Sequence, residues 1–484
     1  MYAESYPQLV YTSIELTLAK LFAFAIYRLF FHPLSGYPGP RLAAISRWYS
    51  AFYAWRGILH LRNKTWHDKY GSVFRSGPNE LSFNSSSSLQ VIYRNSSLIS
   101  KPGIWEALSA SRRTPNILSA VDDAVHNFKR RTISKMFSGY SLKQIEGRIS
   151  GRLNHFVDLL VNPGPKHDLQ DLCDWLSFDF ISDLLYSESC DMLQRPEFRW
   201  IPCAYKIMSQ RSMVCLVQPK FFQYYIDRLF LLRDYRNIMA AGTWARERTK
   251  EQGKSNDGSL QYSEKDMWVE SFLLLAAGAD TTSTTLCALF FYLLHNQEVL
   301  LKVIGEIRTS FTEEDDITGS QLNHCVYLDA CIKETMRLVP AVPNLSPRFV
   351  NSGGLTIRGR YIPPGTIVGT SLYTLMRNSN YFDRADEFLP ERWLSRGCRS
   401  QLLKLEGFEP FGTGLRSCVG MKLAELELKM TIARTLFKCD LRLCPETARY
   451  DAPAGFSFKG WAVASGEKNQ IGNSYVANIA EVLG

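Results

Sequence analysis

The chain has 484 residues, of which 45% are apolar and 21% charged, a balance typical of globular proteins that argues against a disordered, collagen-like or polytopic membrane protein. The net charge of +9 favours an acidic partner or an anionic membrane surface. No nucleic-acid partner is expected, because no basic run interleaves with aromatic residues. The eleven cysteines form no Cys-x-x-Cys pair, so neither a disulfide framework nor a structural zinc site is indicated.

The N-terminal segment contains an apolar stretch from Ile14 to Phe31, broken by three charged residues and followed by the Pro- and Gly-rich hinge Tyr37–Pro40. Its length is close to the roughly 20 residues that a helix needs to cross hydrocarbon. An amphipathic core helix remains an alternative, and a cleaved signal peptide is disfavoured because no small-residue cleavage site follows. The pattern favours a membrane anchor over residues 1–31.

The first half of the chain, from Trp48 to Lys250, has the pattern of amphipathic helices with one extended patch from Ser72 to Phe83. Two loops stand out, Lys101 to Ser119 and the aromatic-rich stretch Phe198 to Tyr235. Their apolar and aromatic content suggests that these two loops, together with the segment Pro340 to Leu345, shape a pocket for a lipophilic ligand. A polar linker, Gln252 to Ser263, ends this half.

The longest apolar run, Trp268 to Leu294, predicts one long helix. Because it is apolar on nearly every face, it lies either at the centre of the fold or in a bilayer, and the Asp and Thr cluster in its middle argues for burial around a polar site. Further predicted elements are a helix over Leu322–Leu338, β-like segments over Pro347–Val368 and a helix over Met421–Phe437.

Cys418 differs from the other cysteines because it lies in a glycine-rich loop that leads directly into the last of these helices. Amides at a helix start and the helix dipole lower a cysteine pKa and hold a thiolate. Gly412, Gly414 and Gly420 let the backbone approach a flat macrocycle, and Arg416 can reach a carboxylate on its rim. The alternative is a buried structural cysteine beside a turn.

The segment Phe411 to Gly420 matches Phe-x-x-Gly-x-Arg-x-Cys-x-Gly, the heme-binding loop of the cytochrome P-450 family, at every fixed position. Such a match arises by chance in a chain this long on the order of 10⁻⁴ of the time. The resemblance implies that Cys418 is the axial thiolate ligand of iron in heme b. It also implies a mainly α fold with small β-sheets (α+β), in a single heme-enclosing domain.

The resemblance places that catalytic domain at residues 32–464, behind the anchor. The segment Gly460 to Gly484 lacks the apolar and charged pattern of the β-hairpin with which members of the family usually close. Residues 465–484 are therefore expected to be an atypical C-terminal tail.

The segment Ala277 to Thr282 resembles the family's oxygen-activation motif. Ala277 and Gly278 would leave room for a diatomic ligand, Thr281 can bond to the carbonyl four residues earlier, and Asp280 can relay protons. The alternative, an Asp and Thr cluster that caps a helix, fits poorly inside a continuous apolar helix.

Two charged residues three positions apart, Glu334 and Arg337, share a helix face. On their own they would be an exposed ion pair. By resemblance they join Arg392, in the later motif Pro390–Trp393, in a buried charged triad with a structural role.

Further residues resemble those that bind heme propionates. His126 and Arg130, four apart on one helix face, resemble an aromatic-x-x-x-Arg motif with His where many members have Trp. Arg348 follows the family's Pro-rich loop, and its alternative is a solvated strand-end Arg. With Arg416, these side chains would neutralise two buried carboxylates.

The resemblance is greatest to fungal microsomal members such as benzoate 4-monooxygenase and isotrichodermin 15-oxygenase. It implies a heme-thiolate monooxygenase that inserts one atom of O₂ into a lipophilic small molecule, as a tailoring step for a terpenoid, polyketide or alkaloid of secondary metabolism. An O₂-independent isomerase or dehydratase and a non-catalytic lipophile-binding relative are the alternatives.

The implied partners are NADPH-cytochrome P-450 reductase, with cytochrome b5 as a further donor, at the endoplasmic reticulum membrane with the catalytic domain in the cytosol. An acidic reductase could dock on a set of basic residues, although such residues are as often a solvated helix face: Lys129, Arg131, Lys135, Lys422, Lys429 and Lys438.

Overall fold

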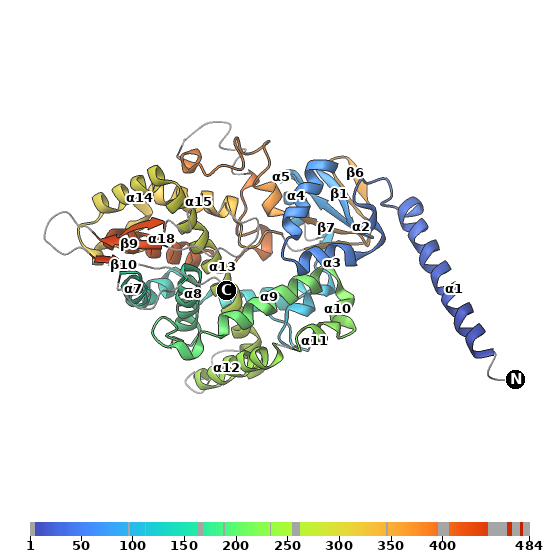
Figure 1. Ribbon diagram of the computed structural model, residues 1–484, viewed down its shortest axis with the longest axis horizontal. Helices are drawn as coiled ribbons and strands as arrows, with labels where there is room; N and C mark the ends of the chain where they lie inside the picture. Colours follow the sequence, from blue (N-terminus) through green and yellow to red (C-terminus); the bar gives the residue numbers. More distant parts are fainter. Residues whose placement is uncertain are drawn as a thin grey trace. The chain divides into compact units, whose positions relative to one another are not determined.

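The computed structural model describes residues 5–94, 97–111, 113–161, 168–186, 189–232, 234–253, 262–344, 347–394, 406–443, 462–466 and 475–477. The chain divides into two compact units (Figure 1). The first comprises residues 1–102 and 344–374, and the second residues 103–343 and 375–484. The described residues are mainly helical with small sheets, which confirms the predicted fold class.

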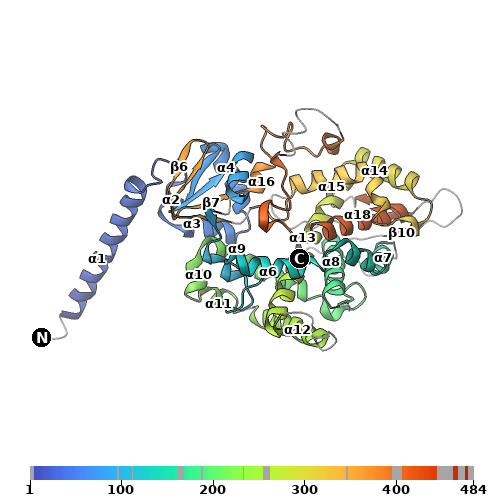
Figure 2. The ribbon, with the colours of Figure 1, turned by 180° about the vertical axis from the view of Figure 1, so that it is seen from behind.

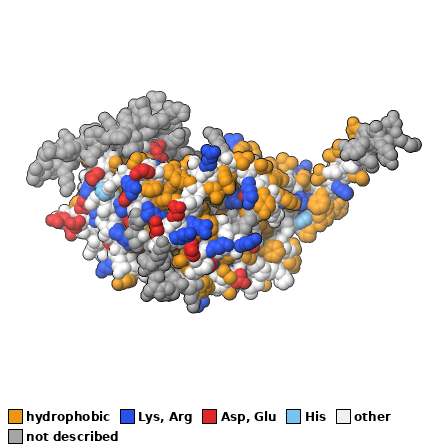
Figure 3. All heavy atoms as spheres, turned by 90° about the horizontal axis from the view of Figure 1, so that it is seen from below, with side chains coloured by type: hydrophobic (Ala, Val, Ile, Leu, Met, Phe, Trp, Pro, Cys, Tyr) orange, Lys and Arg blue, Asp and Glu red, His pale blue; other side chains and the backbone are white. Residues whose placement is uncertain are grey.

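The N-terminal segment is a helix, α1 (Ser5–Ile26), which continues as a π-helical turn over Tyr27–Phe31. Large apolar side chains are exposed along it, and Phe22 is 70% exposed (Figure 3). This exposure is what a lipid-facing helix would show. The anchor assignment of residues 1–31 stays a prediction.

The first unit is built on a five-stranded sheet of order β1-β2-β7-β4-β3. Its two halves come from distant parts of the sequence, because β2 pairs in parallel with β7, with Leu81 opposite Val368. Both of these side chains are buried, which holds the two segments in register. The elements of this unit after α1 are α2 (Arg41–Ile45), α3 (Arg47–Trp55), α4 (Leu59–Tyr70), β1 (Val73–Gly77), β2 (Glu80–Phe83), α5 (Ser86–Arg94), β3 (Ile99–Ser100), β4 (Arg348–Val350), β5 (Leu355–Ile357), β6 (Arg360–Ile362) and β7 (Ile367–Thr370), with α16 (Leu372–Leu375) at its boundary.

The second unit is organised around α13 (Glu264–His295), the predicted long apolar helix. Ser263 caps its start, because the hydroxyl accepts a hydrogen bond from the Asp266 amide at 3.1 Å. Helix α13 is surrounded by α8 (Leu169–Tyr186), α15 (Val326–Leu338) and α18 (Met421–Lys438) (Figures 1 and 2). Among the described residues, α13 is the one helix long and apolar enough to cross a membrane, but 56% of its apolar window is buried. Its packing identifies it as a core helix.

The remaining elements of the second unit are mostly helices around α13. They are the 3₁₀-helix η2 (Gly103–Leu108), α6 (Asp123–Ser134), α7 (Gly139–Val161), α8 (Leu169–Tyr186), α9 (Ile201–Val217), α10 (Pro219–Gln223), α11 (Ile226–Phe230), α12 (Tyr235–Gly253), α14 (Gln297–Ser310), α15 (Val326–Leu338) and α18 (Met421–Lys438), with short 3₁₀-helices at Pro196–Phe198, Glu314–Asp316, Gln321–His324, Pro390–Trp393 and Gly414–Arg416.

The C-terminal strands form a small sheet of order β10-β9-β8, built from β8 (Asp440–Leu443), β9 (Ala462–Gly466) and β10 (Tyr475–Ala477). Strands β9 and β10 pair antiparallel, beside α7 (Figure 1). Strand pairing uses backbone groups and does not require the family's side-chain pattern, so the assignment of residues 465–484 as an atypical tail stays a prediction. The rest of the predicted tail lies outside the described residues.

Candidate active site

The Cys418 loop is a set of tight turns between Phe411 and the start of α18. Gly412 and Gly414 have φ values of 68° and 79°, in the left-handed region that side chains disfavour. These turns fold the loop back, so that the Cys418 amide donates to the Phe411 carbonyl at 2.9 Å. Gly412 and Gly414 are therefore required by the backbone of the loop itself, whereas Gly420 has an ordinary φ of −89°.

Cys418 is an exposed residue, whereas of the other cysteines in the described ranges only Cys203 is exposed. Although the residue has exposed surface, the atoms packed around its sulfur make burial the largest effect, which raises the pKa of the Cys418 thiol. The backbone amide of Gly420 and the guanidinium of Arg130 act in the opposite direction and lower this pKa. A metal cation on the sulfur would complete the stabilisation of a thiolate.

Two arginines hold the two sides of this loop. Arg130, on α6, donates to the Ser417 carbonyl at 2.6 Å. Arg416 donates to the Ala120 carbonyl at 2.7 Å and pairs with Asp123 at 2.7 Å. The structure therefore shows both guanidinium groups bound to protein oxygens, and contact of Arg130 and Arg416 with propionates remains a prediction.

His126 and Arg348, the other two predicted propionate ligands, are both buried. His126 lies one turn before Arg130 on α6, as the spacing predicts. Arg348 belongs to β4 of the first unit, where its guanidinium lies 5.0 Å from the centroid of the Tyr93 ring. Their assignment to the cofactor remains a prediction.

The middle of α13 has an accessible face in an otherwise buried helix. Ala277 is exposed and Thr281, one turn later, is partly exposed, while Ala279 and Thr282 are buried. The Thr281 hydroxyl donates to the Ala277 carbonyl at 2.6 Å, the contact that the sequence predicts. This face therefore carries the small side chain of Ala277 and the hydroxyl of Thr281, whose proton is donated to a backbone carbonyl of the same helix.

Gly278 packs against α8, and its role beside a diatomic ligand stays a prediction. A Cβ atom at this position would lie 2.8 Å from the Cδ1 and Cγ1 atoms of Ile181 on α8. The missing side chain therefore allows α8 and α13 to pack closely, and the space beside Gly278 is already filled. This contact could not be predicted from the motif, because the motif does not show which neighbouring helix Gly278 faces.

Asp280 faces α9 and not the Thr281 side of the helix. The hydroxyl of Ser209 lies 3.5 Å from its carboxylate, and the charge of Lys206 acts on it. Burial raises the pKa of Asp280, Lys206 lowers it and Asp174 raises it further. Lys206 in turn pairs with Asp174, so Asp280 adjoins a polar cluster that includes the partly exposed Lys206 ammonium.

Sequence reasoning missed a buried carboxyl between α13 and α18. Glu427, only 3% exposed, accepts a hydrogen bond from the Thr282 hydroxyl at 3.1 Å. Burial raises the pKa of Glu427 to about 8. The sequence carries no signal for this burial, because Glu427 lies between Glu425 and Lys429 in the pattern of a helix-surface carboxylate.

The predicted charged triad forms a dense hydrogen-bonded cluster. The Glu334 carboxylate accepts from Arg337 Nε and Arg392 Nε, each at 2.9 Å. It also accepts from the Leu389 amide and the indole Nε1 of Trp393, each at 2.9 Å. Because Glu334 and Arg337 are fully buried, this cluster ties α15 to the segment that precedes the Cys418 loop.

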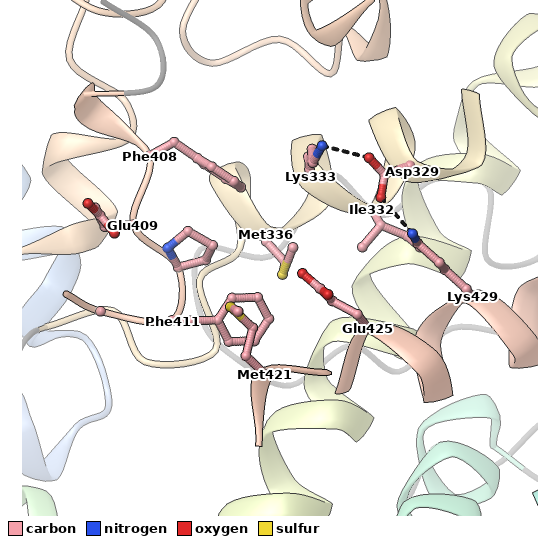
Figure 4. Close-up of a pocket in the computed structure, with 12 residues that line it drawn as sticks. Asp329, Ile332, Lys333, Met336, Phe408, Glu409, Phe411, Met421, Glu425 and Lys429 are labelled. Carbon is pink, nitrogen blue, oxygen red and sulfur yellow. Dashed lines mark ion pairs between the residues drawn. The ribbon is translucent and has the colours of Figure 1, made fainter. Parts of the chain in front are cut away.

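A pocket of about 210 Å³ lies against the Cys418 loop, where Glu425 and Met336 point toward Phe411 (Figure 4). It is smaller than the roughly 300–1,000 Å³ of typical ligand pockets, so it is not a substrate cavity. Three of the six basic residues considered for reductase docking form ion pairs. Lys429 pairs with Asp329 at 3.0 Å, Lys438 pairs with Glu314 at 2.6 Å, and Lys129 is buried against Glu270 at 2.9 Å.

The donors in this unit fit a heme-thiolate group. Cys418, an exposed residue, offers its sulfur at a helix start, beside the Arg130 guanidinium. The accessible Ala277 and Thr281 face of α13 offers a small, weakly polar wall. Among the described residues, no group of three or more His, Cys, Asp or Glu side chains could hold a different metal ion.

Comparison with known proteins gives extensive matches. The family model described as cytochrome P-450 matches residues 38–460. The monooxygenase poxM of Penicillium oxalicum is 32% identical over 457 residues, which cover 88% of this chain and 87% of that protein. The monooxygenase atnE of Emericella nidulans is 31% identical, covering 87% and 89%. Averantin hydroxylase of Dothistroma septosporum is 31% identical, covering 86% and 82%.

Proposed function

This chain belongs to the cytochrome P-450 family of heme-thiolate monooxygenases, and on that premise we propose that it carries out a tailoring hydroxylation of a lipophilic secondary metabolite in a fungus. The observation that carries the proposal is the Cys418 loop, whose glycine turns present an exposed cysteine at the start of α18. Heme bound through Cys418 supplies the iron at which O₂ is reduced.

The residues of α13 supply the proton handling in this proposal. Asp280, with its raised pKa, takes protons from the polar cluster around Lys206 and Ser209. Thr281 holds its own proton against the Ala277 carbonyl and presents its hydroxyl on the accessible face. We infer that Asp280 takes up protons on the α9 side of the helix, and that Thr281 presents its hydroxyl on the neighbouring accessible face.

The substrate class follows from the relatives and from the two loops expected to shape the pocket. One relative is named as a hydroxylase of averantin, and several others are monooxygenases of fungi. A terpenoid, polyketide or alkaloid intermediate is the substrate that we propose.

Electrons come from NADPH-cytochrome P-450 reductase, with cytochrome b5 as a further donor. The exposed apolar helix α1 supports an anchor in the endoplasmic reticulum membrane with the catalytic unit in the cytosol.

The decisive measurement is the spectrum of the reduced, CO-bound protein. The wild-type chain is expected to show the red-shifted Soret band of a thiolate ligand, and Cys418→Ala to lose it. Cys203→Ala, which removes the other exposed cysteine of the described ranges, is the matched control and should keep the band. Absence of the band in the wild type would refute the heme-thiolate assignment.

A further inference from the structure

Arg211, on α9, contacts three neighbouring elements. Its Nε donates to the Asp227 carboxylate of α11 at 2.9 Å, and its Nη1 donates to the Ala107 carbonyl of η2 at 3.1 Å. The guanidinium also lies 5.7 Å from the centroid of the Phe222 ring on α10. One side chain of α9 therefore joins this helix to three short segments of the second unit, η2, α10 and α11.

The segments that Arg211 joins come from both loops predicted to shape the substrate pocket. Ala107 lies within the stretch Lys101–Ser119, and Asp227 within the stretch Phe198–Tyr235. The sequence offers no link between these two stretches, and Ala107 and Asp227 are more than a hundred residues apart in the chain. The fold brings them together at a single guanidinium.

The Arg211 pair lies in a poorly solvated environment. Asp227 is 2% exposed and the Arg211 side chain 12% exposed. Removal of one partner of such a pair leaves a buried charge without compensation, so the pair resists partial opening. One oxygen of Asp227, Oδ1, is buried with no hydrogen-bond partner among the described residues. The guanidinium of Arg211, which donates twice to the other oxygen, Oδ2, is therefore the main compensation for the carboxylate charge.

The same helix also reaches the proton-handling residues. Ser209, two residues before Arg211, lies 3.5 Å from the Asp280 carboxylate of α13. A shift of α9 that opens the Arg211 contacts would therefore also move Ser209 relative to Asp280. The position of η2 and α11 is mechanically linked to the acid of the active site.

We propose that Arg211 is a positioning residue that latches η2 to α11 and thereby sets the rate at which bulky lipophilic ligands enter and leave. The proposal rests on the proposed function, because it takes these two segments as walls of the substrate pocket. The ligand class that it affects is defined by size. A bulky apolar molecule needs the two segments to separate, whereas a small polar one does not.

The test compares two heme-nitrogen ligands of different size by stopped-flow absorbance in the full-length holoenzyme. Imidazole is the small probe and trityl-substituted imidazole the bulky one. In Arg211→Met, association and dissociation of the bulky probe are expected to accelerate at least about tenfold, while the small probe changes less than about twofold. Lys220→Met removes an exposed cation of α10 and should leave both probes unchanged.

Unchanged kinetics of the bulky probe, or equal changes for both probes, would overturn the latch. If Arg211→Met yields no folded holoenzyme, Arg211→Lys decides the question. It keeps the charge but cannot reproduce the forked contacts, so intermediate acceleration supports the latch and wild-type rates overturn it.

A separate readout distinguishes failure of the latch from failure of the proposed function. If the wild-type chain binds no heme, the function fails, but amide hydrogen exchange of the full-length chain still tests the latch. Faster exchange in both η2 and α11 of the folded Arg211 variant supports it. Unchanged exchange in either segment overturns it.

Discussion

Replacing Glu427 by Gln tests whether this buried carboxyl is neutral in the folded protein. Its pKa is raised from 4.5 to about 8 because burial penalises the charged form. The folded state therefore keeps a proton that the unfolded chain releases once the pH exceeds about 4.5. Between these two pH values, the free energy of unfolding of the wild type falls as the pH rises. Above about pH 8 the folded state bears the full cost of a buried, charged Glu427.

The size of this effect follows from proton linkage. A single group that holds a proton only in the folded state changes the free energy of unfolding by on the order of 1 kcal/mol for each pH unit. Gln is always neutral and can still accept the hydrogen bond that Thr282 donates at 3.1 Å. Between about pH 6 and about pH 8, Glu427→Gln should therefore gain on the order of 2 kcal/mol relative to the wild type.

The assay is urea unfolding of the full-length chain at these two pH values, monitored by circular dichroism. Glu298→Gln, which removes an exposed carboxylate of α14, is the matched control and should follow the wild-type profile. Parallel pH profiles for the wild type and Glu427→Gln would refute the neutral carboxyl. They would mean that the folded protein accommodates the charge of Glu427 without a stability cost.

Three other substitutions test the site and its support. Thr281→Ala should keep the CO-bound Soret band but divert NADPH electrons to peroxide, whereas Thr284→Ala, which removes a similar helix-bonded hydroxyl, should keep normal coupling of NADPH to product. Gly278→Ala forces a methyl group against Ile181 and should lower stability by about 1–3 kcal/mol in urea unfolding, so an unchanged midpoint would contradict the packing role. Glu334→Gln leaves buried guanidinium groups without their carboxylate and should cost about 3–5 kcal/mol, visible as a loss of folded holoenzyme, whereas wild-type yield and stability would exclude the structural role.

Local patterns in the sequence were sufficient for the elements whose residues act on their own neighbours. The turns of the Cys418 loop need glycine at positions 412 and 414, so the local sequence is sufficient to indicate them. The back-bonded hydroxyl of Thr281 needs only the carbonyl one turn earlier. The apolar run of α13 predicted a long buried helix, and its ends lie within four residues of the predicted ones.

Contacts between helices could not be predicted in this way, because they depend on how one helix is rotated against another. Lys129 has the sequence pattern of a surface charge, yet α13 places Glu270 against it and removes it from solvent. Glu427 has the pattern of a helix-surface carboxylate, yet α18 turns it toward Thr282. In each case the partner lies more than a hundred residues away in the chain.

The sequence by itself indicated the chemistry of this protein, because the proposed thiolate ligand Cys418, the glycine turns beside it and the hydroxyl of Thr281 all lie within short contiguous segments. Only the tertiary structure decided which charges are buried and which segments are joined. Asp280 meets Ser209, and Arg211 meets Asp227, because helices that are distant in sequence pack side by side. Burial and charge compensation are properties of such packing, and therefore no local pattern of residues specifies them.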